Sequence, residues 1–224
     1  MTPRRLARAA LAAGVLTVGA LVAALLAAGP AAAHPLVWIV ARAEVVFNPE
    51  GKVAGVRHAW TFDEAYSAFV TQGLDKNGDG KLTPEELAPL AEENTKNLEE
   101  SGYFTRLKVS GRAQDFDAPR EPRMIFADGR ATLGFLLPLK APVPPGRGAV
   151  SLEVFDPTFF VDFALADGDD AARLAGAPTG CRTTVTRAKS LAQPGGEPLS
   201  EALFAALTAA ESAKLSNRIL VACP

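Results

Sequence analysis

Twelve consecutive residues, 75–86, carry polar side chains at a spacing that restricts this part of the chain to one local structure. Oxygen-bearing side chains stand at positions one, three, five, nine and twelve of the segment: Asp75, Asn77, Asp79, Thr83 and Glu86. Gly80 occupies position six, where the backbone must turn through a conformation that side chains disfavour. This is the spacing of the EF-hand loop, in which two helices flank a loop that surrounds a Ca²⁺ ion.

The chemistry of the segment fits Ca²⁺, a hard cation that is bound by several oxygen atoms. In this pattern Lys81 contributes its backbone carbonyl, Thr83 acts through a water molecule, and Glu86 supplies two oxygens at once. We therefore predict that residues 75–86 bind Ca²⁺. The alternative is a solvated acidic turn that caps a helix, because Asp, Asn and Gly favour turns in any protein.

The first 33 residues have the three parts of a secretory signal peptide. Three arginines within the first eight residues form a positive start, an apolar run covers residues 9–28, and a site of small residues ends at Ala33. Cleavage after Ala33 would make His34 the first residue of a mature, periplasmic protein. The alternative is an uncleaved membrane anchor, because the apolar run approaches the ~20 residues that a membrane span needs.

Removal of the signal peptide leaves an acidic chain of one domain's length. Residues 1–33 hold three of the 23 lysine and arginine residues and none of the 25 aspartate and glutamate residues, so the mature chain has a net charge of −5. This balance argues against nucleic acid or an anionic membrane surface as a partner. Residues 34–224 are expected to form a single exported domain.

Strand and helix patterns in the mature chain predict an α+β fold. Apolar and β-branched residues at 36–47 and 52–62 flank a turn and predict a hairpin. Helical patterns on both sides of the loop predict an EF-hand inserted over residues 63–101. Further strands are predicted at 106–109, 124–126, 131–140, 149–155, 159–165, 181–187 and 218–223. With an Ala-rich helix at 200–214, the expected fold is a mainly antiparallel β domain with an inserted EF-hand and a C-terminal helix.

Cys181 and Cys223 are the only two cysteines of the chain. An even number of cysteines in an oxidising compartment predicts one disulfide, which would join the C-terminal tail to the segment after Cys181. The gain in stability would be about 3–4 kcal/mol in the chain-entropy model. A redox or metal-binding thiol pair is the alternative, although the chain has no C-x-x-C spacing.

The two histidines, His34 and His58, offer a second kind of metal site. After cleavage at Ala33, His34 would present a free α-amino group and an imidazole nitrogen, and nitrogen ligands suit Cu²⁺ and Ni²⁺. His58 stands on the neighbouring strand of the predicted hairpin and would complete a three-nitrogen site. The alternative is that His34 lies in a frayed terminus and that His58 is hydrogen-bonded to the EF-hand helix.

Six segments of the chain together resemble a known family. They are AHPLVWI at 33–39, RHAWTFDE at 57–64, QGLDKNGDG at 72–80, GYF at 102–104, VFDP at 154–157 and LAGAPTGC at 174–181. They resemble the domain-of-unknown-function 1007 family of exported bacterial proteins, described as the uncharacterised periplasmic component of an ABC-type transport system. The resemblance implies a periplasmic location and an association with inner-membrane transporters of the nickel/cobalt type. Family members carry His-Pro-His at the mature start, whereas Leu36 stands in third place here.

An enzyme is not expected. The sequence has no G-x-S-x-G, H-E-x-x-H or phosphate-binding G-x-x-x-x-G-K-[ST] motif. The carboxylate pairs Asp63/Glu64 and Asp115/Asp117 are explained by helix caps and turns. Three hypotheses follow: a Ca²⁺-binding accessory protein of a metal-cation transport system, a Ni²⁺, Co²⁺ or Cu²⁺ carrier that uses His34 with His58, and a structural envelope protein stabilised by Ca²⁺.

Overall fold

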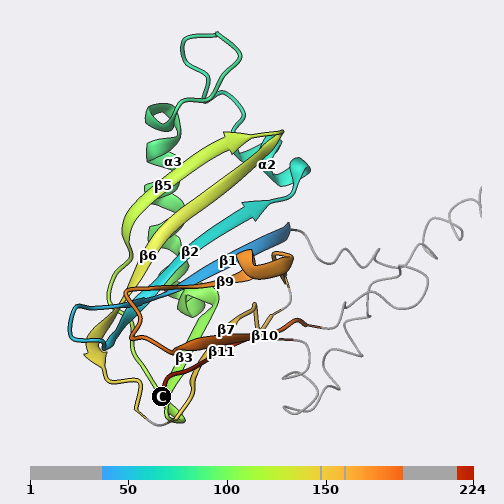
Figure 1. Cartoon of the computed structure of the whole chain (residues 1–224). Coiled ribbons are helices and arrows are strands. Elements are labelled where there is room, and N and C mark those ends of the chain that lie inside the picture. The colour runs from blue at the N-terminus through green and yellow to red at the C-terminus, as the bar shows by residue number, and fades with distance from the viewer. Residues whose placement is uncertain (1–36, 147, 159, 189–215) are drawn as a thin grey trace, which may run out of the picture. The chain divides into compact units, whose positions relative to one another are not determined.

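The computed structural model describes residues 37–146, 148–158, 160–188 and 216–224. Two β-sheets, connected by short helices, form the main part of the fold (Figure 1). They lie in one compact unit that covers residues 34–224. Among the described residues, no helix is both long enough and apolar enough to cross a membrane.

The larger sheet has the strand order β5-β6-β2-β1-β8. β8 pairs with the first part of β1, at residues 37–41, and β9 pairs with the following part, at residues 43–46. Its strands are β1 (Val37–Phe47), β2 (Val53–Phe62), β5 (Arg120–Ala127), β6 (Arg130–Val143), β8 (Val161–Leu165) and β9 (Ala172–Ala175). The hairpin predicted from the first two strand patterns is confirmed, because β1 and β2 pair antiparallel. β8 and β9 pair parallel with β1, which the sequence patterns did not predict.

The smaller sheet has the strand order β10-β11-β7-β3-β4. Its strands are β3 (Thr105–Val109), β4 (Arg112–Ala113), β7 (Val150–Val154), β10 (Arg182–Thr186) and β11 (Asn217–Ala222). All of its neighbouring strands run antiparallel. Cys181 precedes β10, Cys223 follows β11, and the two are joined by a disulfide with their Cα atoms 4.1 Å apart. The predicted disulfide is therefore confirmed.

One hydrophobic core joins the two sheets. In β1 every second side chain from Ile39 to Phe47 is buried, as expected when one face of a strand packs inward. Trp60 of β2 lies edge-on to Phe135 and Phe163, with ring centroids 4.9 and 5.1 Å away. Phe104, which directly precedes β3 of the smaller sheet, packs on Trp60 and Phe163. These rings bring both sheets into the same core cluster.

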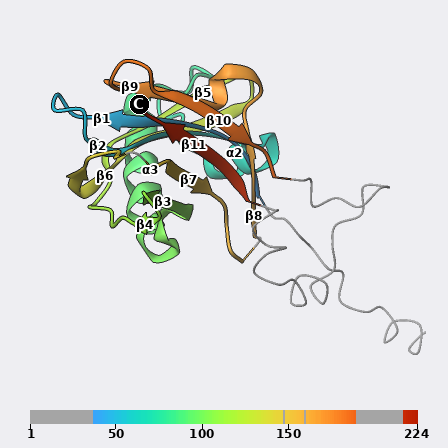
Figure 2. The same cartoon turned by 60° about the horizontal axis from the view of Figure 1, so that its bottom comes forward.

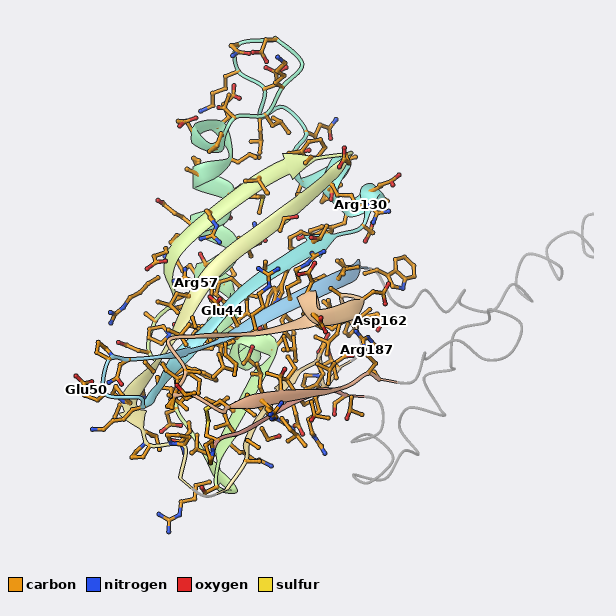
Figure 3. The ribbon with its side chains drawn as sticks, in the orientation of Figure 1. Glu44, Glu50, Arg57, Arg130, Asp162 and Arg187 are labelled. Atoms are coloured by element: carbon orange, nitrogen blue, oxygen red, sulfur yellow. A yellow bond between two sulfur atoms is a disulfide. The ribbon has the colours of Figure 1, made fainter. Side chains whose placement is uncertain are left out.

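The helices are α2 (Glu64–Val70), α3 (Pro84–Asn97) and the 3₁₀ segments η1 (Leu98–Phe104) and η2 (Gly168–Ala171). α3 packs against β5 and β6, and its buried residues Leu87 and Ala91 belong to the core cluster (Figures 1 and 2). α3 and the smaller sheet therefore contact the inner face of the larger sheet. The alternate side chains of its strands form an outer face, on which Arg57 and Glu44 stand (Figure 3).

The predicted α+β fold class with an inserted EF-hand is wrong, because the described chain is mainly β and is built from two sheets. The segment 63–101 is not an EF-hand pair of helices. α2 has only seven residues and ends at Val70, five residues before Asp75, so no helix leads into the loop. The hydroxyl of Thr71 donates to the carbonyl of Ser67 at 2.7 Å where this short helix ends.

The prediction of a C-terminal helix is wrong as well. The chain ends in strand β11, which confirms the final strand predicted at 218–223. Residues 200–214, on which the helix was predicted, lie outside the described residues, as do the predicted signal peptide and His34.

Candidate functional site

The segment 75–86 covers the end of the loop between α2 and α3 and the first residues of α3, and its backbone folds around Asp75. One carboxylate oxygen of Asp75 accepts a hydrogen bond from the N–H of Gly78 at 2.7 Å, and the other accepts from the N–H of Gly80 at 2.9 Å. Both glycines have φ above +70°, which allows the chain to turn here without strain. In Figure 1 the loop, coloured teal, extends at the top of the view beyond β5 and α3.

The side chains at positions three and five continue the same pattern. The amide oxygen of Asn77 accepts from the N–H of Asp79 at 2.9 Å, and Asp79 accepts from the N–H of Lys81 at 2.8 Å. The Asn77 amide also donates to the second Asp79 oxygen at 3.3 Å. The polar side chains of the loop are therefore oriented by the backbone of the same loop.

Glu86 at position twelve closes the loop. One of its carboxylate oxygens accepts from the N–H of Lys76 at 2.9 Å, and the other accepts from the N–H of Thr83 at 3.0 Å. Thr83 and Glu86 form a reciprocal capping box at the start of α3. The N–H groups of Thr83 and Lys76 hold the pKa of the Glu86 carboxyl below its ordinary range. Glu86 therefore carries its negative charge at neutral pH.

The loop is attached to the protein at its apolar residues. Leu74, directly before the loop, and Leu82 within it are partly buried against the core cluster. The described residues contain no group of three or more His, Cys, Asp or Glu side chains placed to hold a metal ion. The structure thus brings the predicted ligands Asp75, Asn77, Asp79 and Glu86 into one closed loop, where their oxygens accept hydrogen bonds from N–H groups.

His58 lies in the core between the two sheets, at 1% exposure. Its ring packs on Trp60 and Phe135, and its Nε2 lies 3.3 Å from the hydroxyl of Thr105 on β3. Burial lowers the pKa of His58 to about 3, so the ring is neutral. The pairing with His34 stays a prediction, because His34 lies outside the described residues.

The predicted carboxylate pairs make cap and turn contacts. Asp63 accepts from the N–H groups of Tyr66, at 2.8 Å, and Trp38, at 3.0 Å, and so joins the start of α2 to β1. Burial raises the pKa of Asp63, but these N–H donors lower it by more. Asp117 accepts from the N–H of Ala118 and from Arg120 at 3.2 Å.

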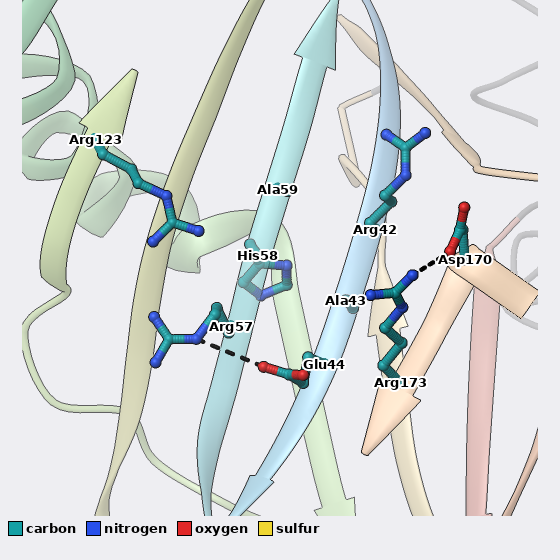
Figure 4. A pocket seen from close by; sticks show the side chains of 9 residues that line it. All are labelled: Arg42, Ala43, Glu44, Arg57, His58, Ala59, Arg123, Asp170 and Arg173. Atoms are coloured by element: carbon teal, nitrogen blue, oxygen red, sulfur yellow. Dashed lines mark hydrogen bonds and ion pairs between the residues drawn. The ribbon is translucent and has the colours of Figure 1, made fainter. Parts of the chain in front are cut away.

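A charged hollow, which the sequence patterns did not predict, lies on the outer face of the larger sheet (Figure 4). Its cavity volume is about 210 Å³. Its charged lining residues are Arg42, Glu44, Arg57, Arg123, Asp170 and Arg173. They are scattered over β1, β2, β5, β9 and η2, so only the pairing register of the strands could have revealed that they meet.

Comparison with known proteins places the chain in a family. A curated protein of Spirochaeta aurantia, described as an uncharacterized 15.5 kDa protein in the trpE 3′ region, is 32% identical over 91 residues. The match covers 41% of this chain and 64% of that protein, so the chain spans less than two thirds of this relative's length. A family model described as protein of unknown function (DUF1007) matches residues 19–223. The chain belongs to this family.

Proposed function

We propose that this is an exported Ca²⁺-binding protein whose ion is held by residues 75–86. The observation that supports the proposal is the contact between the Glu86 carboxylate and the N–H of Lys76, at 2.9 Å. This contact closes the twelve-residue segment, which carries the three carboxylates of Asp75, Asp79 and Glu86. A divalent cation would relieve the repulsion between these like charges.

The hydrogen bonds within the loop are compatible with an ion. A carboxylate has about four lone-pair sites, and hydrogen bonds to Asp75 occupy one on each oxygen. The remaining sites would face Ca²⁺, together with the Lys81 carbonyl and a water molecule on Thr83. Because no helix leads into the loop, we expect weak binding, in the ~10⁻⁴–10⁻³ M range typical of extracellular calcium modules.

Isothermal titration of the metal-free mature protein with Ca²⁺ tests the proposal. Glu86→Gln removes one negative charge and the bidentate coordination of the ion by the carboxylate, while a Gln at this position preserves the capping box. We expect the variant to bind Ca²⁺ at least ~10-fold more weakly than the wild type. The matched control is Glu85→Gln, which removes the same charge from the neighbouring exposed residue.

Two results would contradict the calcium proposal. The first is the absence of saturable Ca²⁺ binding by the wild type up to ~10 mM, well above the expected range. The second is equal weakening by Glu85→Gln and Glu86→Gln, which would indicate a diffuse electrostatic effect of surface charge rather than coordination by this loop.

We infer an accessory role in a metal-cation transport system from the family resemblance. A sensory calcium site would open the loop on ion loss and leave the β core folded, whereas a structural site would lower stability throughout. The transport role is measured by the accumulation of Ni²⁺ and Co²⁺ in cells that lack the gene. The same cells are then complemented with the wild-type gene or with the Glu86→Gln variant. We expect reduced accumulation without the gene and incomplete rescue by the variant. Unchanged accumulation of Ni²⁺ and Co²⁺ in cells without the gene would contradict the proposed role in transport.

A further inference from the structure

Four residues stand in one row across the middle of the larger sheet. The strand register pairs Arg42 of β1 with Ala59 of β2, Ala59 with Gly134 of β6, and Gly134 with Arg123 of β5. Residues that are directly opposite in antiparallel strands point to the same face of the sheet. The row therefore has two small residues in its centre and an arginine at each end. With strands ~4.8 Å apart, the two arginine Cα atoms are about 14 Å apart.

Gly134 has a specific reason to be glycine. A Cβ at this position would lie 2.9 Å from Nε of Arg123, closer than real contacts allow, and 3.2 Å from its Cζ. The Arg123 side chain therefore lies flat across the backbone of β6, with its guanidinium over the centre of the sheet (Figure 4). Gly134 and Ala59 have small side chains or none, so the space above these two residues stays open.

The arginines of the hollow differ in their partners. Arg57 pairs with Glu44 at 3.5 Å and with Glu121 at 2.5 Å, and Arg173 pairs with Asp170. Within the described part of the chain, neither Arg42 nor Arg123 has a hydrogen-bonded or ion-paired partner. The two arginines at the ends of the row therefore have guanidinium donors available to a ligand.

The charge and the size of the hollow define the ligand. Four arginines and two carboxylates line it, and Glu121, the partner of Arg57, adds a third carboxylate beside it, so one positive charge remains in excess in a chain whose formal net charge is −2. Guanidinium groups recognise carboxylate and phosphate oxygens through paired N–H donors. The cavity volume of about 210 Å³ lies below the ~300–1,000 Å³ of sites for drug-sized molecules, so the ligand is small.

We propose that this hollow is a binding site for a small oxyanion with at least two negative charges, a polycarboxylate or a phosphate. Arg123 and Arg42 hold the anion from the two ends of the row, above Gly134 and Ala59. Arg57 stands on the neighbouring row, where Glu44 and Glu121 hold it in place and offset its charge. The site lies on β-strands of the larger sheet, apart from the loop at 75–86, and is independent of Ca²⁺.

Titration of the metal-free mature protein with citrate, inorganic phosphate and pyrophosphate, at constant ionic strength, tests this site and separates the two ligand sources. The metal-free state matters because citrate chelates Ca²⁺ and would otherwise report on the loop. Arg123→Gln and Arg42→Gln each remove one unpaired guanidinium, and both should weaken binding at least ~10-fold. Arg112→Gln on β4 removes the same charge from the other sheet and should change binding less than ~2-fold, since exposed distant charges are screened by salt.

A second variant tests the geometry without a change of charge. Gly134→Ala places a methyl group where the Arg123 guanidinium lies, so it should weaken anion binding several-fold while circular dichroism reports an intact fold. The proposal is overturned if citrate, phosphate and pyrophosphate all fail to bind saturably, or if Arg112→Gln weakens binding as much as Arg123→Gln. It is also overturned, in favour of a macromolecular partner, if only an acidic peptide such as poly-glutamate binds and needs Arg42 and Arg123.

Discussion

At the scale of single residues, His58 shows most clearly what burial does to chemistry. Its ring lies among Trp60 and Phe135, and its Nδ1 has no hydrogen-bond partner within the described residues. Among the described residues, the ring makes one polar contact, with the Thr105 hydroxyl, whose proton is donated to the carbonyl of Tyr103 at 2.7 Å. If the imidazole were removed, Thr105 would therefore keep its hydrogen bond to the Tyr103 carbonyl. His58 contributes apolar packing to the core, and its ability to take up a proton makes the core sensitive to acid.

We predict that His58 makes the protein less stable as the pH falls from 7 to 5. Burial lowers the pKa of His58 from 6.5 to about 3, so between these values the unfolded chain binds a proton that the folded chain does not bind. The stabilisation is complete above pH 6.5 and is lost as the pH falls toward 3. Linkage gives a loss of about 2 kcal/mol between pH 7 and pH 5 for one such group. Urea denaturation at the two pH values measures it.

The control for this prediction is His58→Leu, which keeps an apolar side chain in the core and removes the titrating group. Its free energy of unfolding should vary less between pH 7 and pH 5 than that of the wild type, by about 2 kcal/mol. Most carboxyl groups titrate below this window, and His34 is the only other histidine of the chain. An unchanged pH dependence in His58→Leu would assign the acid sensitivity to other groups.

At the scale of elements, strand patterns were read correctly more often than helical patterns. The two strands of the first hairpin follow the predicted ranges within one residue, because alternating burial leaves a period of two in the sequence. The helix before the loop is shorter than its apolar spacing indicated. α2 ends at Val70, where Thr71 caps its last turn, and Phe69 remains exposed instead of packing inward. The short β4 and β9 were missed, since two to four residues carry little periodic signal.

The disulfide belongs to the same scale, since it joins the ends of two paired strands. Cys181 and Cys223 flank the register pair Arg182 and Ala222 of β10 and β11. We predict that replacing both cysteines by alanine lowers the free energy of unfolding by about 4 kcal/mol, because the chain-entropy model assigns this cost to a loop of this length. Thermal unfolding of the wild type and of the double variant measures the difference.

A reducing agent provides the control for the disulfide prediction. It should lower the midpoint of the wild type to that of the double variant and leave the variant unchanged. Equal midpoints for oxidised wild type and double variant would show that pairing of β10 with β11 is stable without the bond.

At the scale of the whole molecule, the larger sheet separates two environments. Its inner face is closed by α3 and by the smaller sheet, and it holds the aromatic core. Its outer face carries arginines and carboxylates on neighbouring strands, and the loop at 75–86 lies at the start of α3 (Figures 1 and 3). The two proposed sites therefore occupy different parts of the protein and can be tested separately.

The sequence by itself determined the features that depend on local spacing. The period of the strands, the pairing of the two cysteines, the capping box of Thr83 with Glu86 and the spacing of oxygens in the loop all lie within short segments or follow from composition. These features need no knowledge of which strand neighbours which, because the backbone conformation of a few residues is enough to produce them.

Only the tertiary structure decided the fold class, the environment of His58 and the arginine row. The pairing of β8 and β9 with β1, and the order of strands in each sheet, bring together residues that are far apart in the chain. Arg42 and Arg123 share a row because β1, β2, β6 and β5 pair in one register, and a shift of one residue would send either side chain to the opposite face. Strand order and register depend on the packing of the whole core, and for this reason local sequence patterns do not contain them.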